Sequence, residues 1–145
     1  MSAWRRKAIA LFPALRADLD TPDYDLNRLY FDLYVAVSDA HRDLTGSSDA
    51  LLQAAHGYAE WCMHEGGDLW RRAAIGFYED LFNGSGLPWD LLVPWISPYA
   101  AEQIEDTWAL GIGGERAPEF HEQLRMRTRE AYRTHVYATG AIQSL

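Results

Sequence analysis

A long helix is predicted for residues 21–43, TPDYDLNRLYFDLYVAVSDAHRD. Thr21 suits the N-cap, Pro22 the first helical position and Asp23 the positive end of the helix dipole. At about 100° per residue, one broad apolar stripe forms from Leu26, Leu29, Tyr30, Leu33, Val37, Ala40 and Leu44. Phe31 and Val35 lie on the opposite side. Because both sides are apolar, we expect this helix to be central and sandwiched between neighbours.

Capping signals recur along the rest of the chain. The expected N-caps of three further helices are Ser47 or Ser48, Asp68 and Ser97. These helices are expected over residues 47–65, 68–82 and 97–110, and a last one begins at Pro118. The segment between Pro88 and Pro94 permits only a short helical turn.

No segment alternates apolar and polar residues with the β-branched content and turns of a hairpin. The predicted fold is therefore all-α, a compact bundle of about six helices. With 145 residues, 48% of them hydrophobic, the chain has the size of one domain. We expect residues 1–145 to form that single domain, with residues 115–145 as a candidate peripheral C-terminal helix.

Composition limits the compartment and the cofactors. The single cysteine, Cys62, excludes a disulfide framework and multi-cysteine metal sites, and its place on an inward helix face predicts a core residue. No stretch approaches the ~20 apolar residues that cross a bilayer, and the basic amino end lacks a signal-peptide pattern. We expect a cytoplasmic protein that spans no membrane, and no motif predicts a cofactor.

Charge is distributed unevenly along the sequence. The chain carries a net charge of −8, and residues 21–114 hold four arginines against fifteen acids, a local net of −11. Such a segment repels nucleic acid and anionic membranes and favours encounter with a basic protein partner. The plainer interpretation is that this acidity only keeps the domain soluble.

Histidine and glutamate recur every four residues in His56, Glu60 and His64. Eight residues of helix rise about 12 Å, so His56 and His64 cannot share one metal ion. Glu60 with His64 could supply two ligands, which is the weaker alternative. All three lie away from the inward face of their predicted helix, so we expect a solvated face and no metal site.

Two adjacent acids, Glu79 and Asp80, interrupt an otherwise apolar helix. A partly buried carboxylate must be paired or hydrogen-bonded, or its pKa rises. We treat them as a candidate buried acidic pair and favour a salt bridge from one of them to an arginine of another helix. A binding role and acid–base catalysis are the alternatives, and no catalytic residue is assigned.

Aromatic residues are unusually frequent, and most must be core because large rings dominate burial in small domains. Tryptophan is also a hot-spot residue at protein interfaces. Exposed tryptophans among acids would suit a basic partner. The candidate partner-binding residues are Trp61, Trp89, Trp95, Glu102, Glu105 and Asp106.

Two motifs carry a resemblance to known proteins. They are Phe-Tyr-Glu-Asp-Leu at residues 77–81 and Leu-Val-Pro-Trp-Ile-Ser-Pro-Tyr at residues 92–99. Over about residues 20–110 the sequence resembles a group of small all-helical bacterial proteins with a Phe-Tyr-Glu-acid/His-Leu motif, some of them similar to immunity proteins encoded beside secreted toxins. The resemblance implies a helical fold and carries over no catalytic residue.

Three functional hypotheses follow. The first is a non-catalytic protein-binding domain, such as an immunity-type inhibitor that masks a basic toxin or nuclease. The second is a small helical enzyme, dependent on a metal or ligand, that would use Glu60, His64, Glu79 and Asp80. The third is a homo-oligomeric structural protein with a self-interface around Trp89 and Trp95.

Overall fold

The structure is a computed structural model that describes residues 1–104 and 117–139; in the second range, side chains are described for residues 122 and 124–135. Every regular element in these ranges is helical, which confirms the predicted all-α fold. The elements are α1 (Ala3–Leu11), η1 (Pro13–Leu15), α2 (Arg16–Leu19), α3 (Leu26–Arg42), α4 (Asp49–Glu65), α5 (Gly67–Ala73), η2 (Ala74–Gly84), α6 (Trp89–Leu92), η3 (Val93–Trp95), α7 (Pro98–Gln103) and α9 (Ala117–Thr139).

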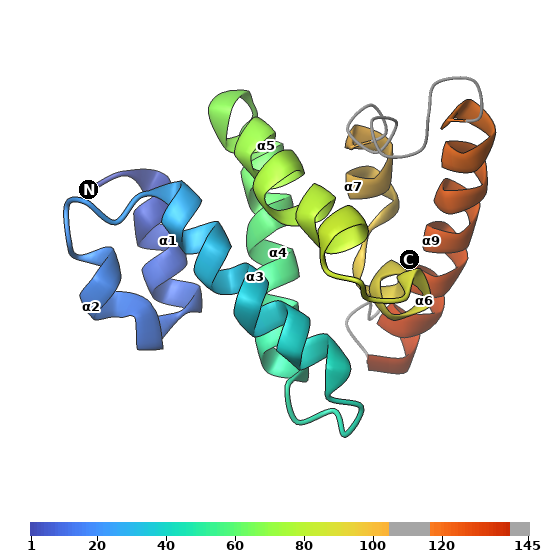
Figure 1. Ribbon diagram of the computed structural model, residues 1–145, viewed down its shortest axis with the longest axis horizontal. Coiled ribbons are helices and arrows are strands. Elements are labelled where there is room, and N and C mark those ends of the chain that lie inside the picture. Colours follow the sequence, from blue (N-terminus) through green and yellow to red (C-terminus); the bar gives the residue numbers. More distant parts are fainter. Residues whose placement is uncertain (105–116, 140–145) are drawn as a thin grey trace.

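The longer helices are arranged around α4 (Figure 1). Helix α4 contacts α1, α3, α5, α7 and η3, whereas α9 packs on η3 and α7 at the opposite end of the molecule from α1. Helix α5 continues directly into η2, so residues 67–84 form one rod that lies alongside α3. The central helix is thus α4, and the expectation that residues 21–43 occupy the centre is wrong.

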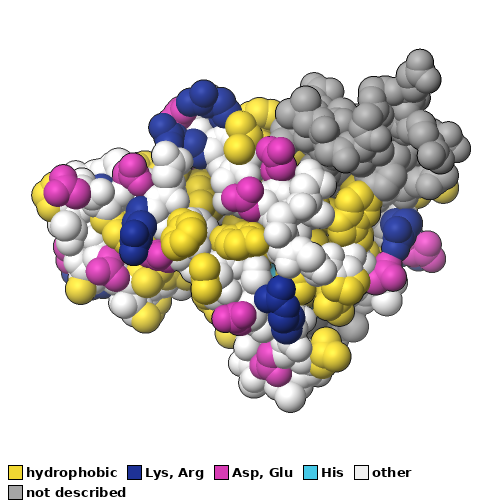
Figure 2. Space-filling model, viewed as in Figure 1, with side chains coloured by type: hydrophobic (Ala, Val, Ile, Leu, Met, Phe, Trp, Pro, Cys, Tyr) yellow, Lys and Arg dark blue, Asp and Glu magenta, His cyan; other side chains and the backbone are white. Residues whose placement is uncertain are grey.

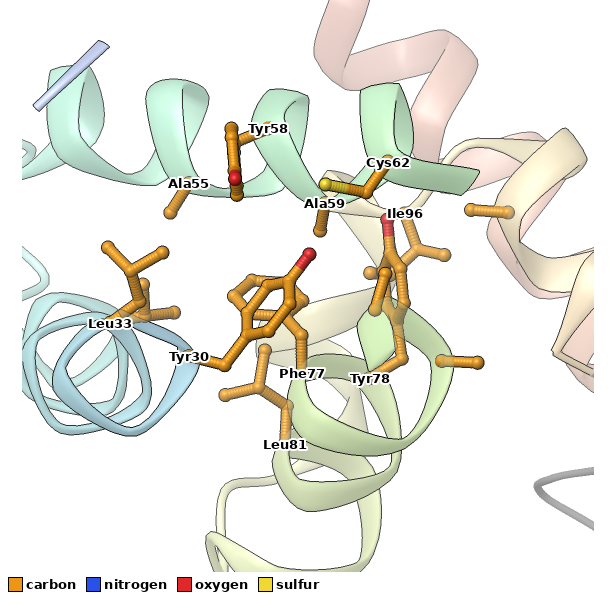
Figure 3. Packing of buried hydrophobic residues seen from close by; sticks show 14 of the residues in the cluster. Tyr30, Leu33, Ala55, Tyr58, Ala59, Cys62, Phe77, Tyr78, Leu81 and Ile96 are labelled. Carbon is orange, nitrogen blue, oxygen red and sulfur yellow. The ribbon is translucent and has the colours of Figure 1, made fainter. Parts of the chain in front are cut away.

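The core is built where α3, η2 and α4 meet (Figure 3). Tyr30 from α3 and Phe77 from η2 lie with ring centroids 6.1 Å apart, and Tyr30 is also 6.1 Å from Tyr58 of α4. Ala55 and Ala59 are fully buried on the side of α4 that is turned toward α3 and η2. Small residues on α4 leave room for large rings from both neighbours, which is how interiors reach close packing. Cys62 is buried here as expected.

The start of α3 differs from the prediction. Its N-cap is Asp25, whose carboxylate accepts a hydrogen bond from the Arg28 backbone N–H at 2.9 Å. Thr21 instead accepts a turn hydrogen bond from the Tyr24 N–H at 3.1 Å. The guanidinium of Arg5 donates to the carbonyls of Thr21 and Tyr24 at 2.9 and 2.8 Å. A contact from α1 therefore holds residues 21–24 outside the helix, and the local cap-plus-proline signal is overridden.

Of the other predicted N-caps, one is confirmed and two differ in the structure. Ser97 caps α7 as expected and accepts from the Ala100 N–H at 3.1 Å. Ser48 occupies the N-cap of α4, but its hydroxyl donates to Asp43 and makes no cap bond. Asp68 lies inside the first turn of α5, where its carboxylate pairs with two arginines. Helix α7 ends at Gln103. The sequence predicts this helix as far as residue 110, but the residues after Ile104 in that range lie outside the described part of the chain.

The second part of the rod formed by residues 67–84, η2, is a π-helix from Ala74 to Gly84. Its buried side chains come in adjacent pairs, Phe77 with Tyr78 and Leu81 with Phe82. The wider i→i+5 turn lets neighbouring residues share one face, and π segments are frequent at functional sites. Within the ranges given above, no helix is long and apolar enough to cross a membrane.

The corrected start of α3 can be tested with one position. Asp25→Ala should lower the free energy of unfolding by about 1 kcal/mol, because the cap bond to the Arg28 N–H is lost. Asp25→Asn should leave it nearly unchanged, since asparagine caps as well as aspartate. Urea denaturation of both variants and the wild type measures the difference. Equal loss in both variants would mean that the charge, and not the cap bond, stabilises this end.

Candidate functional site: a groove between α3 and η2

None of the three predicted partner-binding tryptophans is exposed; each is half-buried. Trp61 stacks on Tyr58 with ring centroids 6.0 Å apart. Trp89 donates its indole N–H to the carbonyl of Phe82 at 2.8 Å. Trp95 packs against histidines of α3 and α4. These side chains hold the molecule together, and a role in partner binding stays a prediction.

The predicted acidic contacts are only partly within the described chain. Glu102 is exposed on α7, beside a hollow of about 80 Å³ that it shares with Arg125 and Arg129 of α9. Glu105 and Asp106 lie outside the described residues. Glu102 therefore sits next to basic side chains of its own chain, which weakens its case as a contact for a basic partner.

The candidate acidic pair is not buried. Asp80 is exposed and Glu79 is half-buried, and within the described residues neither forms an ion pair. The predicted salt bridge to another helix is therefore wrong. The arginine nearest in sequence, Arg72, pairs with Asp68 and donates to Asn27 instead. Removal of water by surrounding protein raises the pKa of Asp80.

The solvated face predicted for His56, Glu60 and His64 is wrong for one of its members. His56 is buried, and its Nε2 lies 2.9 Å from Nε2 of His41. Helix α3 covers this part of α4, which an isolated helical wheel does not show. Glu60 accepts from the Ser97 hydroxyl at 2.7 Å, and exposed His64 stacks on Tyr99 at 4.1 Å.

These groups do not assemble a catalytic or metal centre. Nε2 of His64 lies 3.7 Å from Oε1 of Glu60, so these two are neighbours, but Asp80 faces α3 from a different rod. In the part of the chain that the structure describes, no three histidine, cysteine or acidic side chains converge with metal-binding geometry. The residues of the enzyme hypothesis therefore do not form one site: Glu60 and His64 lie together on α4, and Asp80 lies apart from them on η2.

The surface feature that stands out is an exposed apolar stripe that was expected to be covered. Phe31 and Val35, one turn apart on α3, are 61% and 48% exposed, so the predicted sandwiching of α3 is wrong. Ile75 on the neighbouring rod is 52% exposed. Figure 2 shows hydrophobic side chains gathered across the middle of this face. The two-sided apolar pattern was visible in the sequence, but nothing in it said which side remains uncovered.

A groove of about 430 Å³ runs between α3 and η2 on this face. Its lining consists of Asn27, Tyr30, Phe31, Tyr34, Gly76 and Asp80. A methyl group built on Gly76 would meet the Tyr30 ring at 3.5 Å, so at this point the two rods approach to ordinary van der Waals contact. The glycine leaves the floor of the groove without a side chain.

Two hydrogen bonds tie α3 to the neighbouring rod, one at the Asn27 end of the groove and one beyond its lining. Arg72 donates to the side-chain oxygen of Asn27 at 2.7 Å, and Arg42 donates to the carbonyl of Ser85 at 3.1 Å. Because early residues of α3 meet early residues of the rod, and late residues meet late ones, the two helices run parallel. The groove lining on α3 runs from Asn27 to Tyr34, which is about two turns or about 10 Å of helix.

The arginines of α3 near the groove have acidic partners, whereas the acid in the groove lining has no basic partner among the described residues. Arg28 lies 3.4 Å from Asp32 with its guanidinium 6.0 Å from the Phe31 ring centroid, and Arg42 lies 3.7 Å from Asp39. Both arginines of α3 are therefore paired with acidic partners on the same helix. Among the lining residues, the Asp80 carboxylate is the one charge, and it has no cationic partner in the described chain.

Comparison with known proteins returned no match: the sequence fits no family model and is significantly similar to no curated protein or solved structure. The resemblance to small all-helical bacterial proteins therefore remains a prediction. The groove has to be interpreted from its own chemistry.

Because Asp80 has no cationic partner in the described chain, its replacement should not lower the free energy of unfolding. Asp80→Asn should leave the free energy of unfolding at pH 7 unchanged or higher, because the raised pKa of Asp80 means that folding disfavours its ionised form. Relative to this variant, the wild type should gain stability as the pH falls toward the ordinary aspartate pKa. Urea denaturation at pH 7 and pH 4 measures both effects.

Asp68→Asn is the matched control with the opposite sign. Hydrogen bonds from Arg72 and Arg71 lower the pKa of Asp68 in the folded protein. The contribution of Asp68 to the free energy of unfolding is therefore present above the ordinary aspartate pKa and is lost as the pH falls through the lowered pKa of the folded state. This variant should be less stable than the wild type at pH 7. A clear loss of stability in Asp80→Asn would reveal a favourable contact of Asp80 and remove it from the candidate site.

Proposed function

We propose that this protein is a non-catalytic protein-binding domain whose α3–η2 groove takes an amphipathic helical segment of a basic partner protein. The observation that carries the proposal is the exposed apolar stripe of Phe31 and Val35 beside an unpaired carboxylate, Asp80. Contiguous exposed apolar surface with a polar rim is typical of protein interaction sites.

The shape of the groove favours a helix as its occupant. It is straight, because two parallel rods form its walls, and its lining on α3 is about two turns long. A helix that binds in a groove presents residues at i, i+3, i+4 and i+7, and it satisfies its own backbone hydrogen bonds. A volume of about 430 Å³ suits a few such side chains. A strand is disfavoured because neither wall offers free backbone donors and acceptors.

The charges favour a basic partner. The net charge of −8 gives the molecule a long-range attraction for cations. At short range, a lysine or arginine of the bound helix would supply the counter-charge that Asp80 lacks. Electrostatic complementarity of this kind acts mainly on the association rate. An immunity-type inhibitor of a basic toxin or nuclease would be one member of this class.

Peptide selection tests the proposal without a known partner. A phage library of 16-residue helical peptides is selected on the wild-type protein and screened by fluorescence anisotropy. We expect the selected peptides to share apolar residues at helical spacing and at least one lysine or arginine. Their affinity should fall at least about tenfold in Phe31→Ser, the loss of one well-buried anchor contact. Asp80→Asn should slow their association, with a smaller effect at high salt.

Leu44→Ser is the control variant, because Leu44 is 80% exposed and lies outside the groove lining. It should bind the selected peptides as the wild type does. Peptides that lack positive charge, or that bind Phe31→Ser as well as the wild type, would refute the proposal. Sedimentation equilibrium gives the remaining outcome: a dimer that Phe31→Ser dissociates would make a second copy of this chain the occupant.

A further inference from the structure

A buried pair of histidines joins α3 to α4, away from the groove lining. His41 and His56 are 4% and 5% exposed, and their Nε2 atoms lie 2.9 Å apart. At this distance one imidazole donates a single proton to the other. Two imidazoles that each carry a proton on Nε2 would repel, so the pair accommodates one shared proton between its facing nitrogens.

Aromatic rings enclose the pair on its other sides. Trp95 of η3 stacks on His56 at 5.9 Å and meets His41 edge-on at 6.1 Å. Phe77 of η2 lies edge-on to His56 at 5.2 Å. The outer side of Trp95 is covered by His135 of α9, at 4.5 Å. Trp95 therefore lies between the histidine pair and α9.

The surroundings of Nδ1 in each ring determine which imidazole donates the hydrogen bond between the two Nε2 atoms. Nδ1 of His56 is buried and has no hydrogen-bond partner among the described residues, whereas Nδ1 of His41 is not enclosed in this way. A buried N–H without an acceptor is costly, so the proton of His56 belongs on Nε2. His56 then donates to His41, and His41 carries its own proton on Nδ1.

A further proton can enter the pair only at a cost. On Nδ1 of His56 it would leave the bond between the rings intact, but it would place a charged N–H in a buried position without an acceptor. Protonation of His41 on Nε2 would place two N–H groups face to face. Reversal of the bond would move the proton of His56 to its enclosed Nδ1. Each of these changes also brings a positive charge among Trp95 and Phe77, away from water. Burial accordingly lowers the pKa of His41 to about 4 and holds that of His56 well below its ordinary value.

We propose that the His41–His56 pair is an acid-operated latch, which holds Trp95 and α9 on the α3–α4 framework at neutral pH and releases them when it takes up a proton. Of the elements that pack against the pair, η2 and η3 present the uncharged rings of Phe77 and Trp95. Helix α9 presents His135, and the interaction with it opposes a positive charge on His56. In the described chain no carboxylate is bonded to either ring to offset a charge.

Hydrogen exchange of the full chain tests the latch. Once released, the histidines take their ordinary pKa of 6.5, whereas His41 in the closed state titrates at about 4. For His41 alone, the linkage of these two values raises the open population about twentyfold between pH 7 and pH 5, and proton uptake by the released His56 raises it further. We expect amide exchange in α9, corrected for the intrinsic effect of pH, to accelerate by at least about twentyfold. Exchange in α1 should change less.

Variants separate the latch from a general loss of stability at acidic pH. His41→Gln/His56→Gln removes both titrating groups and should largely abolish the pH dependence of exchange in α9. His64→Gln, at an exposed histidine of α4, should retain it. Unchanged pH dependence in the double variant, or its loss in His64→Gln, would overturn the proposal.

Nuclear magnetic resonance of the wild type decides the matter if the double variant fails to fold. The His41 and His56 imidazoles should stay neutral to about pH 5 and then titrate together with changes in α9 signals. Independent titration near the ordinary pKa, with α9 unaffected, would overturn the latch. Stoichiometric binding of added Zn²⁺ at neutral pH, lost in the double variant, would also overturn it and make the pair a metal site.

Discussion

The packing of α3 and η2 against the alanine face of α4 is the contact on which the rest of the structure depends. Ala55 and Ala59 occupy little space, so the rings of Tyr30, Tyr58 and Phe77 fill the region between the three helices (Figure 3). The two rods on the other side of this core lie parallel and close. Their inner faces make the core, and their outer faces make the walls of the groove. The same closure of α3 onto α4 brings His41 to His56. Core, groove and histidine pair are therefore products of one packing arrangement, and a change that widened it would disturb all three.

The sequence predicted those features that local interactions determine. The all-α class follows from periodicity, and the cap of α7 follows from Ser97 and Pro98 because the hydroxyl reaches an amide three residues away. Cys62 was assigned to the core from its helix face alone. In each of these cases the partner lies within a turn of helix, or the pattern repeats over several turns. Contacts at that range are encoded in the residues that make them.

Features set by distant contacts were missed. The start of α3 depends on Arg5, sixteen residues before Thr21, whose guanidinium binds the turn that precedes the helix. The burial of His56 depends on α3, whose His41 lies fifteen residues earlier in the sequence. For the groove, periodicity correctly placed apolar residues on two sides of α3, but Phe31 and Val35 were wrongly assigned to a buried side. A helical wheel describes what a face consists of, and only the positions of the other helices determine whether that face is covered.

The setting of Cys62 gives this protein a built-in reporter of its own motions. The thiol is enclosed between helices whose tyrosine hydroxyls point toward it (Figure 3), and burial raises its pKa, so the folded chain holds it protonated and out of contact with solvent. Alkylating reagents attack the thiolate, which forms only when α4 separates from α3 or η2. With one cysteine in the chain, every modification reports on this one position. The alkylation rate thus reports the population of molecules in which the central contact is open, without any introduced label.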